Sequence, residues 1–312
     1  MDHRSALDSA LRSPFVFALC QPGAEPVVRE EMLAHGLSPS FSAPGFVTAK
    51  AKTALSLREL PRLVFGRRVC LSLADVVDGD AFARAHGARL HREAGDDRGA
   101  PVEPGELAVT MVVRGRPFCG VHVGAPGLSR DPCGDARLEV PPAAPSRAWL
   151  KLEEAARVFP LPLSAGDGVV EVGCAPGGMT RALLDRGAFV VGVDRNAMDP
   201  RIVAETRFRH LRASARHVEA SLVPGVWPAP VRMLVVDVNL PPNSALSAVS
   251  SIARAVRPTL RAALFTLKLG DWRLVSELPH WRGRIERMLG MTTTATQLPS
   301  NRQELTVFAA PA

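Results

Sequence analysis

The stretch that decides the fold is VVEVGCAPGGMTRALLDRGAFVVGVD, residues 169–194. Val169–Val172 is a short apolar strand, and residues 173–178 form a glycine- and proline-rich turn. Thr180–Arg186 has helical spacing, and Phe189–Val193 is a second strand that ends in Asp194. Two parallel strands joined by a helix form a βαβ unit, whose ligands lie at the carboxyl ends of the strands. The stretch therefore predicts a ligand-binding α/β domain.

The composition of the turn points to the class of ligand. A dinucleotide fingerprint has the order G-x-G-x-x-G and faces a pyrophosphate. Here Glu171 precedes Gly173, and Pro176 stands before Gly177 and Gly178. An acid at the turn disfavours a phosphate and suits a cationic ligand that carries an amino acid. The turn therefore favours S-adenosylmethionine over another nucleotide or a purely structural turn, and Asp194 is placed to bond the ribose diol.

The amino-acid composition indicates which kinds of partner and which cellular compartment to expect. The 312 residues carry a formal net charge of +7, which favours a polyanionic partner, although arginine enrichment alone gives the same sign. The five cysteines are odd in number and form no C-x-x-C, which is typical of free thiols in a reducing cytoplasm and of a protein without a zinc site. No apolar run approaches the ~20 residues of a membrane span. We expect a cytoplasmic protein with no membrane or metal partner.

The N-terminal part predicts a small α+β domain over residues 1–124. Residues 78–106 have little periodicity and indicate a linker or a weak helix, and residues 125–145 are an irregular connector rich in Gly and Pro. Residues 57–65 form a helix or an edge element. The remaining predicted elements are a helix over Glu25–Ala34, strands over Phe15–Leu19, Gly45–Ala49 and Val69–Leu73, and a hairpin of Leu107–Val113 and Phe118–Val123.

The C-terminal part, residues 146–312, predicts one mostly parallel, doubly wound sheet. A helix begins at Ser146, a good N-cap residue, and precedes the βαβ unit. The elements that follow are strands over Phe208–Leu211, Val231–Val238 and Ala262–Lys268, helices over Ala245–Val256 and Val275–Leu289 (broken near Pro279), and a closing β pair over 291–298 and 304–309.

Four ionisable residues stand at element ends or on polar faces: Lys151, Asp237, Lys268 and Glu304. Each one alone reads most simply as a solvated surface charge. Lys268, however, directly follows the apolar run LFTL, so its stem is buried and its charge needs a partner or its pKa falls. A lysine whose pKa is lowered by burial and by a second cation can take the proton of a ribose hydroxyl, and the two carboxylates can hold both amines in place.

These residues resemble the Lys-Asp-Lys-Glu tetrad of the FtsJ-type 2′-O-ribose RNA methyltransferases. The turn VGCAPGG is similar to that family's S-adenosylmethionine loop, and the likeness extends over APSRAWLKLEEA, FTLKL and RQELTV, across residues 107–312. The resemblance implies a Rossmann-like methyltransferase domain, an RNA substrate such as ribosomal RNA, Lys268 as general base, and Lys151, Asp237 and Glu304 as orienting residues. It implies these S-adenosylmethionine contacts: Glu171, Gly173, Cys174, Pro176, Gly177, Gly178, Met179, Asp194, Ser214 and Asp237.

Two departures from the family leave alternatives open. Ser214 stands where the family usually has an acid near the adenine, and the N-terminal region resembles a shortened form of the family's THUMP RNA-binding module. A catalytically weakened RNA-binding or ribosome-assembly factor on the same fold is therefore one alternative. Asn239-Leu240-Pro241-Pro242 suggests a methyltransferase acting on nitrogen, although no aromatic residue follows. The arginines at 62, 67 and 68 and the Arg114–Arg116 turn are candidates for phosphate contacts or for plain solvated surface.

Overall fold

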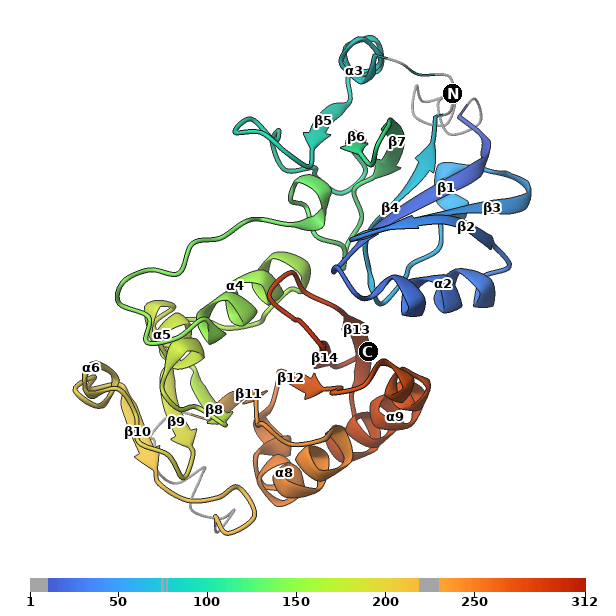
Figure 1. Cartoon of the computed structure of the whole chain (residues 1–312). Helices are drawn as coiled ribbons and strands as arrows, with labels where there is room; N and C mark the ends of the chain where they lie inside the picture. The colour runs from blue at the N-terminus through green and yellow to red at the C-terminus, as the bar shows by residue number, and fades with distance from the viewer. Residues whose placement is uncertain (1–10, 74–75, 77, 219–229) are drawn as a thin grey trace. The chain divides into compact units, whose positions relative to one another are not determined.

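The computed structural model describes residues 11–73, 76, 78–218 and 230–312, which form two compact units (Figure 1). The first unit runs to Arg137 and includes 157–159, and the second comprises Leu138–Ala156 and Pro160–Ala312. Each is built on its own seven-stranded sheet. The polar sequence of residues 1–13 predicts a frayed segment; residues 1–10 of it lie outside the described residues, and Ser13 begins the first strand.

The first unit is an α+β fold. Its sheet has the order β2-β3-β1-β4-β7-β6-β5, antiparallel throughout except for the parallel pair β5 and β6. Helix α2 (Glu25–Ala34) buries Val27, Val28 and Met32, as its sequence predicts. The strands are β1 (Ser13–Cys20), β2 (Ser38–Ala43), β3 (Phe46–Leu55), β4 (Gly66–Ser72), β5 (Arg89–Arg92), β6 (Leu107–Val113) and β7 (Pro117–Val123).

The stretch 78–106 was predicted as a linker or a weak helix, and the linker alternative is wrong. It contains helix α3 (Gly79–His86), whose first turn is capped by the Asp78 side chain, and the edge strand β5. Periodicity is weak because both elements are short and half exposed. The sequence also gives no prediction of the edge strand β2. The element predicted over residues 57–65 is a 3₁₀ turn that covers only Leu57–Glu59.

The predicted connector 125–145 divides between the two units. Its first part belongs to the first unit, which continues to Arg137. Hydrogen bonds hold it there: the Val102 amide donates to the Arg130 carbonyl at 2.8 Å, and the Arg98 guanidinium donates to the Asp135 carbonyl at 2.7 Å. Backbone bonding of this kind carries no periodic signal in the sequence.

The second unit has the Rossmann-like fold that the sequence predicts. Its sheet has the order β10-β9-β8-β11-β12-β14-β13, in which β14 pairs antiparallel with both β12 and β13 and all other neighbouring strands pair parallel. Figure 1 shows α4 and α5 on one side of this sheet and α8 and α9 on the other. The strands are β8 (Gly168–Val172), β9 (Phe189–Val193), β10 (Phe208–Leu211), β11 (Val231–Val236), β12 (Ala262–Lys268), β13 (Thr292–Thr296) and β14 (Glu304–Ala310).

The helices of the second unit begin and end where caps and prolines dictate. The Ala148 amide donates to the Ser146 hydroxyl at 3.4 Å, so Ser146 precedes α4 as predicted. A proline starts both α8 and α9, since proline suits the first helical turn. The helices are α4 (Ala148–Val158), α5 (Gly178–Asp185), α6 (Pro200–Val203), α8 (Pro242–Val256) and α9 (Leu278–Leu289). Among the described residues, no helix has the length and apolarity that crossing a membrane requires.

Candidate active site

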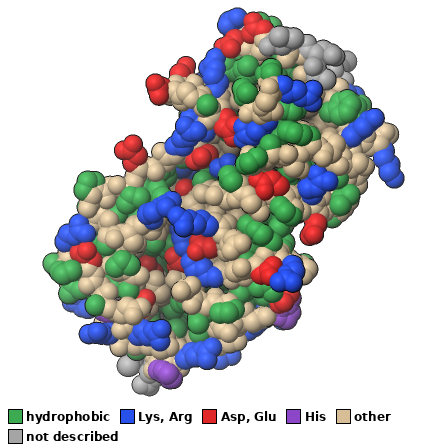
Figure 2. Space-filling model, in the orientation of Figure 1, with side chains coloured by type: hydrophobic (Ala, Val, Ile, Leu, Met, Phe, Trp, Pro, Cys, Tyr) green, Lys and Arg blue, Asp and Glu red, His purple; other side chains and the backbone are tan. Residues whose placement is uncertain are grey.

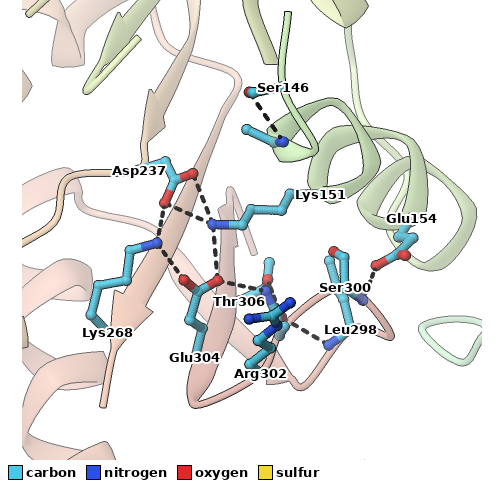
Figure 3. A network of polar contacts seen from close by, with 12 residues as sticks. Ser146, Lys151, Glu154, Asp237, Lys268, Leu298, Ser300, Arg302, Glu304 and Thr306 are labelled. Carbon is cyan, nitrogen blue, oxygen red and sulfur yellow. Dashed lines mark hydrogen bonds and ion pairs between the residues drawn. The ribbon is translucent and has the colours of Figure 1, made fainter. Parts of the chain in front are cut away.

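Four charged side chains from distant parts of the second unit form a closed ring (Figure 3). The Lys151 amine lies 2.9 Å from Asp237 Oδ2 and 2.9 Å from Glu304 Oε2. The Lys268 amine lies 2.8 Å from Asp237 Oδ1 and 2.5 Å from Glu304 Oε1. Each amine therefore binds both carboxylates, and each carboxylate binds both amines.

The fold explains why these four residues meet. Asp237 directly follows β11, and Lys268 ends the neighbouring parallel strand β12, so both stand at one edge of the sheet. Strand β14 runs antiparallel to β12 and pairs Glu304 with Lys268, which brings its first residue to the same edge. Lys151 comes from α4, whose buried stripe is Leu150, Leu152, Glu154 and Ala155. The structure thus brings the predicted four together, and their catalytic role stays a prediction.

The ring balances two positive charges with two negative charges in a partly buried place. Side-chain exposure is 9% for Asp237, 12% for Lys151 and about a fifth for the other two. Burial by itself lowers the pKa of Lys268, but the charge of Asp237 and the hydrogen bonds to Asp237 and Glu304 outweigh it, so the pKa is raised. The expectation of a lowered pKa for Lys268 is therefore wrong for the ring as it stands, because the carboxylates dominate over burial.

Two buried polar residues that the sequence did not reveal hold the ring in place. The Asn301 side chain is fully buried, accepts hydrogen bonds from the Leu298 amide and the Thr306 hydroxyl at 2.9 Å each, and approaches Glu304 Oε2 to 3.5 Å. Glu154, on the helix that carries Lys151, accepts the Ser300 amide at 2.8 Å. The loop that precedes Glu304 is thus fastened to the helix of Lys151 (Figure 3).

A cleft of about 460 Å³ lies beside the ring, at the carboxyl ends of the parallel strands. Of the predicted cofactor contacts, Gly173, Asp194, Ser214 and Asp237 line it. Asp237 belongs to both the cleft and the ring. Sequence reasoning missed further lining residues, among them Arg195, Asn196, Val238 and Ala248. The loop of Asn239 and Leu240, considered for nitrogen methylation, also lines the cleft.

The other predicted cofactor residues do not line this cleft. The Cys174 side chain is 2% exposed, with its thiol 3.5 Å from Met198 Sδ, and Met179 is 1% exposed in the core. The side chains of Cys174 and Met179 pack inward, so any contact of these residues with the cofactor would come from the backbone and stays a prediction. Pro176 and Gly177 lie in the turn and Gly178 begins α5, and their contact with the cofactor also stays a prediction.

Glu171 is a buried carboxyl group behind the cleft. It is 1% exposed, and it accepts the Thr180 hydroxyl at 2.7 Å. Burial raises its pKa to about 8, and the nearby Asp237 and Asp194 add to the rise. Asp194 itself accepts the backbone amides of Ala175 at 3.1 Å and Asn196 at 2.8 Å, so it also fixes the turn.

Gly173 is a glycine for a reason of packing. Its φ is +86°, and a Cβ there would lie 2.4 Å from the Asp237 carbonyl oxygen. The turn must therefore press against the backbone that carries Asp237, which couples cleft and ring. Close backbone packing therefore requires a glycine here, and the contact of Gly173 with the cofactor stays a prediction.

We expect Gly173→Ala to destabilise the protein by about 1–3 kcal/mol more than Gly166→Ala. Gly166 is the matched control because it has a φ of +89° with nothing within 4 Å of an added Cβ, so it carries the backbone strain alone. Urea unfolding of both variants measures the difference. Equal destabilisation would show that the contact with Asp237 is absent.

The cleft is lined by charges of both signs. Asp194 and Asp237 line it together with Arg195 and Arg216, and the described part of the chain holds no group of three His, Cys, Asp or Glu side chains arranged for a metal ion. The two acids can accept hydrogen bonds from a ribose diol and an amino group, both of which S-adenosylmethionine carries.

Comparison with known proteins identifies the domain. Residues 144–278 match the family described as FtsJ-like methyltransferase. The "Ribosomal RNA large subunit methyltransferase M" of Methylococcus capsulatus is 35% identical over 191 residues, which are 57% of this chain and 50% of that protein. The protein of the same name from Alkalilimnicola ehrlichii is 31% identical over 246 residues, 74% of this chain and 59% of that protein.

The segments around Lys151, Lys268 and Glu304 predict a particular likeness to RlmM, the large-subunit rRNA methyltransferase M, and these matches confirm it. The chain spans about half the length of these relatives. With the sheet order and the closed ring of charges, the match leads to one conclusion: the second unit of this chain is an FtsJ-like methyltransferase domain.

Proposed function

We propose that the chain transfers a methyl group from S-adenosylmethionine to a ribose 2′-hydroxyl of RNA, and that the RNA is ribosomal. One observation carries the proposal: Asp237 lines the cleft and also closes the Lys-Asp-Lys-Glu ring. The site for a cationic methyl donor and the site for proton removal thus share a side chain. The relatives' name, which specifies large-subunit ribosomal RNA, supports the substrate. A cytoplasmic location is part of the same proposal.

The cleft would hold the cofactor through residues on the edges of three strands. Asp194 follows β9 and would accept the ribose diol, while Asp237 and the Gly173 backbone would face the amino acid end. Ser214 would contact the adenine in place of an acid. Glu171 would act on the bound cofactor from its buried position behind the turn. When bound, S-adenosylmethionine supplies an electrophilic methyl group on a good leaving group.

The ring would align the ribose hydroxyl and remove its proton. Lys151 donates from α4 and Lys268 from β12, so a hydroxyl entering between them meets an amine on either side. Lys268 accepts the hydroxyl proton in its neutral form. Asp237 and Glu304 fix the direction of both amines, which places the oxygen for an in-line displacement. The first unit, proposed as a reduced THUMP-like domain, would hold the RNA.

The test is direct. The full chain is incubated with transcribed large-subunit rRNA and isotope-labelled S-adenosylmethionine, and the RNA is digested to nucleosides for mass spectrometry. The proposal expects label on ribose. Label on a base would support the nitrogen methyltransferase, and absence of cofactor binding by calorimetry at millimolar concentration would support the RNA-binding or assembly factor.

Glu171 gives a prediction about pH and stability. Its pKa in the folded state is about 8, above the ordinary 4.5 of an unfolded glutamate. Between these values the unfolded chain releases the proton and the folded chain keeps it, so this residue lowers the free energy of unfolding as pH rises from about 4.5 to 8. We expect Glu171→Gln, which keeps the acceptor for Thr180, to be more stable than the parent at pH 8 and equal to it near pH 4.5. Thermal unfolding at both pH values measures this, and a gap that does not widen with pH would contradict it.

A further inference from the structure

The first unit carries a cluster of phenylalanine rings, two of which are exposed. Phe15 on β1 is 43% exposed and Phe41 on β2 is 44% exposed, whereas most phenylalanines of a folded domain are buried. Phe118 on β7 is half-buried beside them, and Phe17 and Phe46 lie in the core beneath. We name the set Phe15, Phe41 and Phe118 the aromatic patch.

The deeper rings pack against Phe41 and Phe118. Phe41 stacks on Phe118 with centroids 6.1 Å apart and planes 14° apart, and Phe118 packs on Phe46 at 4.7 Å. Phe46 in turn lies 5.3 Å from Phe17. Fixed rings are the platform that stacking requires, because little side-chain entropy is lost when a flat ligand covers them.

Cations flank the rings, and acids are missing from the hollow between them. The Arg116 guanidinium lies 4.8 Å above the Phe118 ring, and the Lys50 amine lies 5.6 Å from the Phe15 ring, since β3 pairs Lys50 with Phe15. A hollow of about 310 Å³ contains Phe15, Phe41, Phe118 and Arg116 among its lining residues, and no Asp or Glu among those that are described. The hydroxyls of Ser40, Thr48 and Ser72 line it too.

The other arginines expected to contact phosphates are tied internally. Arg62 donates to the Pro126 carbonyl, Arg68 to the Ser129 carbonyl, and Arg67 to the Cys20 carbonyl. Arg114 pairs with Glu93 at 2.6 Å. Arg116 is exposed and has no carboxylate partner among the described residues. Figure 2 shows Lys and Arg side chains spread over the visible face, so net charge alone does not mark the RNA-binding surface.

From this geometry we infer that the aromatic patch binds a single-stranded segment of RNA, with bases stacked on Phe15 and Phe41 and phosphates at Lys50 and Arg116. Aromatic rings beside cations are the pattern by which proteins hold unpaired nucleotides, because every base has a face to stack and every linkage a negative charge. The hydroxyls around the hollow suit ribose. The inference rests on the proposed function for RNA as partner, and it adds where an unpaired stretch of that RNA is held.

The test uses 5′-fluorescein hexauridylate and the full chain, with binding measured by fluorescence anisotropy and no cofactor added. We expect Phe15→Leu/Phe41→Leu to bind at least tenfold more weakly and Phe41→Trp to bind within about twofold of the parent. For Lys50→Gln, the slope of log K against log salt concentration should become less steep by the amount expected for the loss of about one phosphate contact. Leu33→Ala is the control, because Leu33 is 59% exposed on α2 and is not among the residues that line the hollow, so it should change nothing.

Unchanged RNA affinity in the double leucine variant would overturn the inference. A changed sedimentation coefficient of that variant, with its RNA affinity unchanged, would show that the patch is an interface between copies of the chain. If that variant unfolds, ultraviolet crosslinking of the parent to hexauridylate decides: adducts on Phe15 or Phe41 peptides support the patch, and adducts confined elsewhere reject it. Because no methyl transfer is involved, failure of the proposed reaction leaves this result readable.

Discussion

We expect Lys268→Met to lose about 10²- to 10⁴-fold of the methyl transfer rate while S-adenosylmethionine still binds, because the variant lacks the amine that accepts the proton. Methionine keeps the apolar stem that lies at the end of β12 and removes the charge that binds Asp237 and Glu304. Lys268 is absent from the lining of the cleft, so the cofactor contacts remain. Single-turnover rates with rRNA and calorimetry with the cofactor measure the two effects separately.

Lys268→Arg separates the proton acceptor from the charge. An arginine restores the positive charge of the ring but stays protonated at any working pH, so it cannot act as a base. We expect Lys268→Arg to be nearly as inactive as Lys268→Met, with the stability of the parent largely restored. Parent-like turnover in either variant would remove Lys268 from the role of base.

The pH profile of the parent follows from the raised pKa of Lys268. Burial lowers this pKa and the two carboxylates raise it further than burial lowers it, so the amine is protonated at neutral pH. The neutral fraction that can accept a proton grows tenfold per pH unit below the pKa. The transfer rate should therefore keep rising with pH through the neutral range, and a flat profile between pH 7 and 9 would place proton removal elsewhere.

The convergence of the four charged residues could be predicted because each has a strong local marker. Asp237 and Lys268 directly follow the apolar runs MLVV and LFTL, and parallel strands must share their carboxyl edge. The helix that follows Ser146 is likewise marked by a capping residue, and the strand that begins at Glu304 by the alternation of its side chains. The βαβ unit around Gly173 has both periodicity and a turn that no helix tolerates.

What escaped prediction depends on contacts between distant segments. Asn301 sits in a loop with no periodic signal, and its burial follows from its bonds to Leu298 and Thr306. The direction of the Lys268 pKa depends on two carboxylates that reach it from other strands. In the first unit, α3 and β5 are too short to show a pattern, so a stretch of Gly, Asp, Arg and Ala resembled a linker.

The second large effect is expected for Asp237→Asn, which leaves two amines facing one carboxylate. Asp237 is 9% exposed and binds both lysines, so its loss should cost on the order of 3 kcal/mol of the free energy of unfolding and on the order of 10²-fold in transfer rate, since each amine then keeps only Glu304 as its carboxylate partner in the ring. Urea unfolding and single-turnover rates measure these losses. In the parent, the raised pKa of Lys268 adds stability that is fully present below pH 10.5 and is lost as pH rises through the folded-state pKa.

Asp237→Asn also has an expected signature in pH that plain damage would not give. Removing the negative charge lowers the pKa of Lys268, so the rising limb of the rate should move to lower pH even though the maximum falls. The double variant Asp237→Asn/Lys151→Met restores charge balance between Lys268 and Glu304, and we expect it to recover part of the lost stability. Additive losses in the double variant would show that the four residues act separately. A rising limb that stays in place would show that Asp237 does not set the protonation of Lys268, and the ring would then be an anchor between strands with no part in removing a proton.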